Sequence, residues 1–330
     1  MQSRASTLLF AAVLCATLGW AEESWGQAKV PRVGIIGFGL RATDELFRKW
    51  LEPFRRTLAD RGWIEGKNVA FEYRLVHADQ PSQLSQVAAE LVLLKVDVIY
   101  ATDAPSVRAV YAATRTIPIV AFDLTANPVA AGYVENYGQP GGNLTGIFLD
   151  APDFAGKWVE LLSTIVPGLK RVAVLWDPSP GTAHLQGVQN VARTLGLQLQ
   201  VLEVRSSDDI DRAFSALRGP PQALIILPSP MTYQHSGQLA RLALEHRLPA
   251  TSMFRIFAEA SGAIAYGPDM VSSTERGAIL VAKILDGASP AGLPVERPTK
   301  VQLVVNLKTT KALGLKIPDS LLVRADEVIR

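Results

Sequence analysis

The chain has 330 residues, of which 48% are hydrophobic and 19% are charged. This length and composition suit about two ordinary domains with buried cores and are not typical of a disordered chain. The formal net charge is only +2, and no run of Lys or Arg stands out. We therefore expect neither nucleic acid nor an anionic membrane surface as the main partner.

The first 28 residues have the pattern of an export signal. Arg4 precedes an apolar stretch at residues 5–19, which has the length of a signal peptide and is short for a membrane-spanning helix. Small residues allow cleavage after Ala21 or after Ala28, and we favour Ala28 because the first strand begins soon afterwards. An uncleaved membrane anchor is the alternative. For a Gram-negative source, the predicted location of the mature protein is the periplasm.

Cys15 is the only cysteine, and it lies inside this apolar stretch. Leu14 precedes it, where a lipoprotein signal normally has a small residue, so we do not expect lipidation. The mature protein would contain no cysteine, which excludes disulfides, thiol catalysis and cysteine-ligated metals.

After this segment, short apolar runs alternate with helical patterns, as in a parallel sheet that is covered on both faces. The first helix is predicted from about Asp44 to Arg61, where apolar side chains recur at helical spacing and Gly62 provides a stop. The next helical pattern follows Pro81. The strands of this first series are expected at residues 32–37, 69–73, 96–101 and 117–122.

The same order of strands and helices starts again at Arg171. Strands are expected at residues 171–176, 197–201, 223–227 and 248–252, and helices at about residues 181–195, 208–217 and 232–246. We interpret the two series as two similar, doubly wound α/β lobes with a cleft between them.

Further strands at residues 262–267 and 301–305, with a helix and a Pro-rich connector between them, predict three crossings between the lobes. The expected hinges lie near residues 147–151, 258–264 and 288–299. Lobe 1 would comprise residues 29–148 and about 264–288, and lobe 2 residues 149–263 and about 299–330.

Several long motifs carry a family resemblance. They include residues 58–68 (LADRGWIEGKN), 140–146 (PGGNLTG), 166–176 (VPGLKRVAVLW) and 305–309 (VNLKT). With these motifs the chain resembles the substrate-binding proteins of ABC transporters, in the subfamily that includes the tryptophan-binding component TrpX.

The resemblance implies a type I periplasmic-binding fold, in which two lobes close on a small solute and deliver it to a permease in the inner membrane. Characterised members of the family bind amino acids, aromatic ones among them. The sequence departs from the family pattern at Asn127-Pro128, where Asp-Pro is usual, and in the loop at residues 38–41. Because both departures lie at the expected pocket, tryptophan is not carried over as the ligand.

Ligands of open parallel sheets bind outside the carboxyl ends of the strands, where helix N-termini present free N–H groups. This position selects the candidate ligand-binding residues. In lobe 1 they are Phe38, Thr102, Asp103, Asp123, Asn127 and Phe148; in lobe 2 and near the crossing they are Asp177, Ser229, Met231, Arg255, Tyr266 and Asp269.

Several of these candidates have an expected role and a structural alternative. Asp123 would hold a ligand ammonium, and Arg255 would clamp a carboxylate unless it forms a surface or interlobe ion pair. Phe38 and Phe148 would enclose an apolar or aromatic group unless they pack in the core. Helix capping is the alternative for Thr102 and Asp103.

The predicted function is capture of an amino acid or other small carboxylate by a monomer, without catalysis or cofactor. A ligand-sensing protein of the same fold that acts on a receptor is one alternative. Another is a nucleotide-dependent enzyme, since residues 37–42 match the dinucleotide pattern G-x-G-x-x-A. Against the enzyme, Glu72 is followed by Tyr73 and does not end its strand as a ribose-binding acid should. The histidines also lack metal-ligand spacing.

Overall fold

The structure is a computed structural model that describes residues 30–330 except for residues 40–43, 79, 150–151 and 220. The predicted signal segment, with Cys15 and both cleavage positions, lies outside the described residues. Within the described part of the chain, no helix combines the length and the apolar character needed to cross a membrane.

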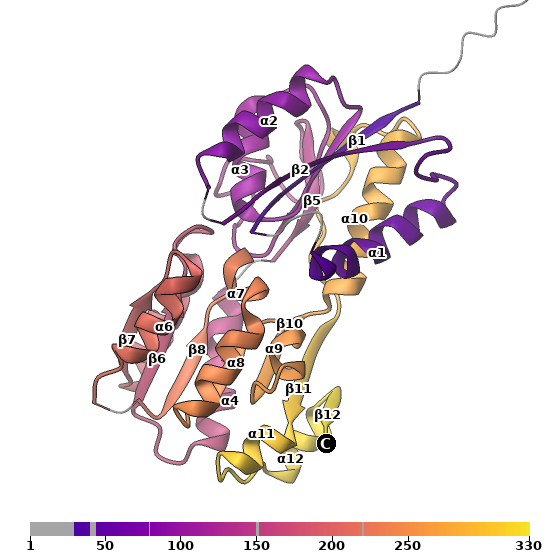
Figure 1. Cartoon of the computed structure of the whole chain (residues 1–330). Helices are drawn as coiled ribbons and strands as arrows, with labels where there is room; N and C mark the ends of the chain where they lie inside the picture. Colours follow the sequence, from indigo (N-terminus) through magenta and orange to yellow (C-terminus); the bar gives the residue numbers. More distant parts are fainter. Residues whose placement is uncertain (1–29, 40–43, 79, 150–151, 220) are drawn as a thin grey trace, which may run out of the picture. The chain divides into compact units, whose positions relative to one another are not determined.

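The first sheet has five parallel strands in the order β2-β1-β3-β4-β5 (Figure 1). They are β1 (Arg32–Phe38), β2 (Ala70–Val76), β3 (Val98–Ala101), β4 (Ile119–Asp123) and β5 (Leu144–Phe148). Helices α2 (Gln83–Leu93) and α3 (Ala104–Ala113) pack on one face, and α1 (Glu45–Asp60) and α10 (Met270–Leu285) pack on the other. Every residue of β3, β4 and β5 is buried, because both faces are covered.

The second sheet has seven strands in the order β12-β11-β10-β9-β8-β6-β7. They are β6 (Arg171–Trp176), β7 (Gln198–Glu203), β8 (Ala223–Ile226), β9 (Ala250–Ser252), β10 (Ile264–Pro268), β11 (Val301–Asn306) and β12 (Glu327–Ile329). All neighbouring strands are parallel except β10 and β11, which are antiparallel.

Helices also cover both faces of this second sheet. On one face lie α4 (Pro152–Ile165) and α5 (Ala183–Leu195); on the other lie α6 (Ser207–Ser215), α8 (Ser236–Glu245) and α9 (Arg255–Glu259). The short elements are α7 (Pro230–Gln234), η1 (Pro290–Gly292), α11 (Leu307–Ala312) and α12 (Asp319–Arg324). The prediction of two doubly wound α/β lobes is therefore confirmed, with one antiparallel strand pair added.

One predicted lobe boundary is wrong. The chain from about residue 264 was expected in lobe 1, but β10 lies in the second sheet, where Ile264 pairs with Thr251 of β9. Its pairing with β11 continues as far as Pro268, opposite Val301. The chain therefore crosses to lobe 1 after Pro268 and not at residues 258–264, and of this segment only α10 packs on the first sheet.

The return crossing follows a short extension of the first sheet. Glu296 bridges to Ile147, and backbone hydrogen bonds of 2.9 Å join Glu296 to Gly146 and Phe148 of β5. The chain then enters lobe 2 as β11. This places the crossing at the end of the Pro-rich connector.

Apolar periodicity explains how α1 is placed. Phe47, Leu51, Phe54 and Leu58 are buried against the first sheet, as their helical spacing predicts. Gly62 has a φ of +89°, the left-handed conformation that suits glycine just after a helix.

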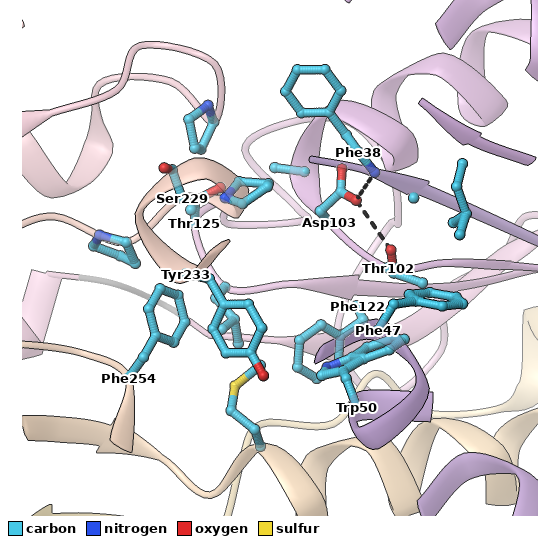
Figure 2. Close-up of a pocket in the computed structure, with 18 residues that line it drawn as sticks. Phe38, Phe47, Trp50, Thr102, Asp103, Phe122, Thr125, Ser229, Tyr233 and Phe254 are labelled. Carbon is cyan, nitrogen blue, oxygen red and sulfur yellow. Dashed lines mark hydrogen bonds between the residues drawn. The ribbon is translucent and has the colours of Figure 1, made fainter. Parts of the chain in front are cut away.

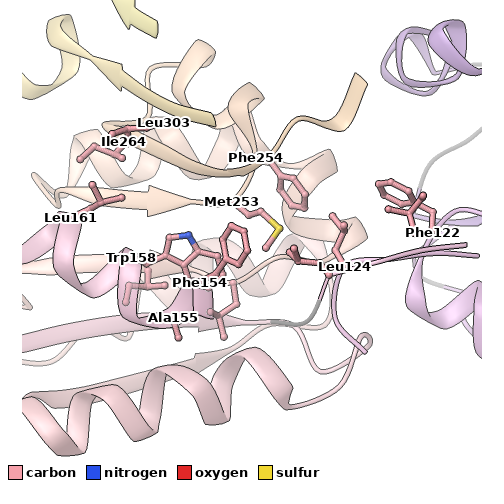
Figure 3. Close-up of a cluster of buried hydrophobic side chains, with 14 of the residues drawn as sticks. Phe122, Leu124, Phe154, Ala155, Trp158, Leu161, Met253, Phe254, Ile264 and Leu303 are labelled. Carbon is pink, nitrogen blue, oxygen red and sulfur yellow. The ribbon is translucent and has the colours of Figure 1, made fainter. Parts of the chain in front are cut away.

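One buried hydrophobic cluster contains residues of both lobes. Phe154 and Trp158 of α4 pack with Met253, and the Trp158 indole N–H donates to the Tyr266 carbonyl oxygen at 2.9 Å. Figure 3 shows Leu124, from the loop after β4, beside these side chains. The loop after β4 is thereby anchored in both lobes.

Candidate functional site

One pocket is lined by residues of both lobes, at the carboxyl ends of the parallel strands (Figure 2). From lobe 1 come Gly37, Phe38, Phe47, Trp50, Leu75, Thr102, Asp103, Ala104, Phe122, Leu124, Thr125 and, at the start of α10, Met270. From lobe 2 come Pro180, Pro228, Ser229, Pro230, Tyr233 and Phe254. This is the position at which open parallel sheets bind their ligands.

Aromatic rings form the lobe 1 wall of the pocket. Phe47 and Trp50 lie one helical turn apart near the start of α1, with ring centroids 6.1 Å apart. The Trp50 ring also meets Phe122 edge-on at 6.2 Å and stacks at 6.0 Å on the buried ring of Tyr100. These contacts restrict the rings, so the wall is preorganised for a flat apolar group.

The lobe 2 wall carries a second aromatic pair. Tyr233 of α7 and Phe254, which follows β9, meet edge to face with ring centroids 5.0 Å apart. Ser229 caps α7, because its hydroxyl accepts from the backbone N–H of Thr232 at 3.0 Å. Figure 2 shows aromatic side chains from both walls around the pocket.

Asp103 is the only residue with a charged side chain among the lining residues that the structure describes. Its carboxylate accepts from the backbone N–H groups of Ser106 at 2.9 Å and Phe38 at 2.8 Å, and from the Thr102 hydroxyl at 3.1 Å. Burial raises the pKa of Asp103 to about 6, against the lowering effect of these hydrogen bonds. The pocket thus combines apolar rings with one carboxylate that suits a cation.

Asp123 shapes the pocket without lining it. Its Oδ1 atom accepts from the backbone N–H of Thr125 at 2.8 Å, from the Thr125 hydroxyl at 2.7 Å and from the backbone N–H of Ala126 at 3.1 Å. Its Oδ2 atom is buried and has no hydrogen-bond partner among the described residues. Burial raises the pKa of this carboxyl. The side chain holds the loop that carries Leu124 and Thr125 into the pocket.

Of the predicted ligand-binding residues, the pocket brings together Phe38, Thr102, Asp103 and Ser229. It does not include Asp123, Asn127, Phe148, Asp177, Met231, Arg255, Tyr266 or Asp269.

Arg255 and Tyr266 make contacts outside the pocket. The Arg255 guanidinium pairs with Glu259 and Glu327 of its own lobe, each at 2.7 Å, so the expected carboxylate clamp is a surface ion pair. The Tyr266 ring packs against Phe154, with centroids 5.5 Å apart.

The other residues outside the pocket serve the local structure. Asn127, Asp177 and Asp269 accept hydrogen bonds from backbone N–H groups two or three residues further on, as turn and helix-capping residues do. Phe148 and Met231 are buried in the cores of their lobes.

Sequence reasoning missed most of the aromatic residues of the pocket. The helical spacing of Phe47 and Trp50 predicts the apolar stripe of a helix, and nothing in that spacing distinguishes a pocket wall from a core. Phe122 and Phe254 lie at or after strand carboxyl ends, so the rule that selected Phe38 would also have found them.

The glycines of the dinucleotide-like motif have a packing role. A Cβ atom at Gly37 would come within 2.7 Å of the Thr102 hydroxyl oxygen, and one at Gly39 within 2.9 Å of Pro230 in lobe 2. Gly39 also has a φ of +98°, which few other residues adopt. Close packing of this segment against Thr102, which follows β3, and against Pro230 of lobe 2 therefore accounts for both glycines without a bound nucleotide.

Known proteins resemble this chain over most of its length. A sequence model of the family described as ABC transporter substrate binding protein matches residues 47–329. A tyrosine-binding protein of Clostridioides difficile (strain R20291) is 27% identical over 268 residues, which are 80% of this chain and 76% of that protein.

Two solved structures are similar in fold. A conserved domain protein from Vibrio cholerae O1 biovar El Tor superimposes with a TM-score of 0.82 and 26% identity, covering 91% of this chain and 100% of that chain. The ABC domain from Streptococcus pneumoniae in complex with L-Trp gives a TM-score of 0.81 and 20% identity, with 91% and 99% covered.

Proposed function

The chain belongs to the family of ABC transporter substrate-binding proteins, and we propose that it captures an amino acid with an aromatic side chain for import. The observation that carries the proposal is the pocket with an aromatic wall from each lobe and, among its described lining residues, one carboxylate. The tyrosine-binding relative and the L-Trp complex support this class of solute.

The ring and the ammonium group of such a solute each have a partner in the pocket. The ring would lie among Trp50, Phe122 and Phe254, where stacking and removal of apolar surface from water favour binding. The ammonium group would lie at Asp103, because an ionised carboxylate is its strongest hydrogen-bond acceptor. The hydroxyls of Thr125 and Ser229 would complete the polar contacts.

Hinged closure would convert solute binding into a signal for a permease. The connections between the sheets, after β5, at residue 269 and at residues 298–300, would bend while each lobe moves as a body. Binding energy would then shift the population towards the closed form rather than drive a chemical step. The permease in the inner membrane would recognise the surface that the two closed lobes form together.

Export completes the proposal. Residues 1–28 would direct the chain out of the cytoplasm and be removed, which leaves a monomeric binding protein in the periplasm.

The test is a calorimetric titration of residues 29–330 with L-Trp, L-Tyr and L-Phe, with L-Asp, L-Leu and D-glucose for comparison. We expect saturable binding of at least one aromatic amino acid. At 100 times its dissociation constant, that amino acid should raise the free energy of unfolding by about 2.7 kcal/mol. Binding of the sugar alone, or of no amino acid, would contradict the proposal.

Uptake distinguishes transport from sensing. Deletion of the gene should abolish high-affinity uptake of the amino acid that the protein binds. Unchanged uptake in the deletion strain would rule out the importer and favour a receptor partner.

A further inference from the structure

Arg108 reaches from α3 in lobe 1 to the loop between β6 and α5 in lobe 2. Its guanidinium donates hydrogen bonds to the carbonyl oxygens of Ser179 and Pro180, the latter at 3.3 Å. Pro180 lines the pocket, whereas Arg108 does not. The contact therefore joins the lobes at the edge of the pocket without occupying the space of a solute.

The loop that accepts these hydrogen bonds is held by its own contacts. The buried Asp177 carboxylate accepts from the Ser179 backbone N–H at 2.8 Å and from the Ser179 hydroxyl at 2.9 Å. The Trp176 indole N–H donates to the Gly181 carbonyl oxygen at 3.0 Å. The loop contacts thus hold the two acceptor carbonyls in place independently of Arg108. Little conformational entropy of the loop is therefore lost when Arg108 binds them.

We propose that Arg108 is a latch, a positioning residue that holds the two lobes closed and slows the release of solute. The inference rests on the proposed function in one respect, that solute binding is coupled to closure of the lobes. Opening would separate the guanidinium of lobe 1 from the carbonyls of lobe 2. The latch therefore stabilises the closed form selectively and raises solute affinity by linkage.

The dissociation rate is the quantity that the latch controls, because solute leaves through the open form. In stopped-flow fluorescence with the aromatic amino acid that binds best, Arg108→Ala should raise koff about ten-fold, the effect of losing a charge-assisted contact. The association rate should stay within about two-fold, since encounter occurs in the open form. An unchanged koff would overturn the latch.

Two further variants separate the latch from other effects. Arg108→Lys keeps the positive charge near Asp123 but lacks the planar fork that reaches two carbonyls, so it should restore only part of the loss. Full restoration would assign the effect to charge and overturn the latch. Arg115→Ala is the matched control, because that guanidinium lies 4.0 Å above the Tyr111 ring within lobe 1 and should leave koff unchanged.

A double-mutant cycle tests whether the acceptor loop is part of the same device. Asp177→Ala frees the loop that carries the two carbonyls and should also raise koff. The double variant with Arg108→Ala should be little worse than the stronger single variant, because both remove one interaction. Additive effects would show that Arg108 acts without this loop.

Distance measurements separate failure of the latch from failure of the proposed function. Cys15 is the only cysteine and lies in the predicted signal segment, so residues 29–330 accept spin labels only at introduced cysteines. Leu93→Cys and Leu195→Cys place labels at exposed positions, one on each lobe. If no amino acid binds, the proposed function fails. The latch then still predicts that Arg108→Ala shifts the unliganded distance distribution towards the open form. An identical distribution with and without Arg108 overturns it.

Discussion

The Nε2 atom of His184 lies 2.9 Å from the carbonyl oxygen of Leu124, and this contact joins the two lobes. His184 belongs to α5 in lobe 2, whereas Leu124 follows β4 in lobe 1 and lines the pocket. Because a carbonyl can only accept, Nε2 carries the proton and donates it. The ring packs 5.7 Å from Trp158, and its Nδ1 atom is buried without a partner among the described residues.

Acid should destabilise the protein through His184. Burial lowers the pKa of His184 from 6.5 to about 4, so the folded state holds this proton less tightly than the unfolded state does. The stabilising contribution is complete above pH 6.5 and is lost as the pH falls towards 4. Between pH 7.5 and pH 5 the free energy of unfolding should fall by about 2 kcal/mol. Urea denaturation at the two pH values measures this loss.

Two matched variants test whether His184 causes this pH dependence of stability. His184→Gln should reduce the loss of stability between pH 7.5 and pH 5, although it is less stable than the wild type at pH 7.5. His246→Gln is the control, because His246 is exposed and should leave the loss unchanged. Equal pH dependence of the wild type and His184→Gln would refute the assignment.

Trp50→Ala should weaken the binding of aromatic amino acids by at least ten-fold, or about 1.4 kcal/mol. The substitution removes a ring that both lines the pocket and stacks on Tyr100. Trp50→Phe should recover most of the affinity because it keeps a flat apolar group. Calorimetric titration measures the affinity of each variant. Trp63→Phe is the control, because the Trp63 indole N–H donates to Asp286 away from the pocket. A larger effect of the Trp63 variant would contradict the assigned wall.

Solute affinity should depend on the protonation of Asp103. Its pKa of about 6 in the folded state lies above the ordinary 3.8, so the carboxylate is charged above pH 6 and neutralised below it. An ammonium-bearing solute should therefore bind about ten-fold more weakly at pH 5 than at pH 7.5. The same shift favours protonation in the folded state, so this group stabilises the fold as pH falls from about 6 towards 3.8.

The Asp103→Asn variant tests that dependence while keeping an oxygen to cap α3. It should bind weakly at both pH values, with a flat profile in calorimetric titrations. Asp269→Asn alters the equivalent capping residue of α10 outside the pocket and should retain the wild-type profile. A sloping profile in Asp103→Asn would place the titrating group elsewhere.

Arg255→Ala should leave solute affinity unchanged within about two-fold. Its guanidinium pairs with Glu259 and Glu327 at the surface of lobe 2, and exposed pairs of this kind contribute about 1 kcal/mol or less to stability. Calorimetry and thermal unfolding of the variant test both statements. A large loss of affinity would restore Arg255 to the site as a carboxylate clamp.

The chain order of apolar runs and helical stripes was enough to predict two α/β lobes, because burial on both faces leaves continuous apolar strands. The lobe to which residues 264–268 belong could not be derived in this way. An apolar strand suits either sheet, and only its pairing with Thr251 and Val301 assigns it to the second.

The residues of the candidate site, too, were only partly predictable from the sequence. Strand carboxyl ends are visible in the sequence, and they led to Phe38, Thr102, Asp103 and Ser229. Whether a residue at such an end faces the pocket, the core or a turn depends on strand register and on what packs above it. The structure places Phe148 in the core and Asp177 in a turn. The sequence by itself determined the fold class and the edge of the sheets at which the pocket lies. Only the tertiary structure decided which side chains line the pocket and which join the lobes, because those contacts, such as Arg108 with Ser179, connect residues that have no local relationship in the chain.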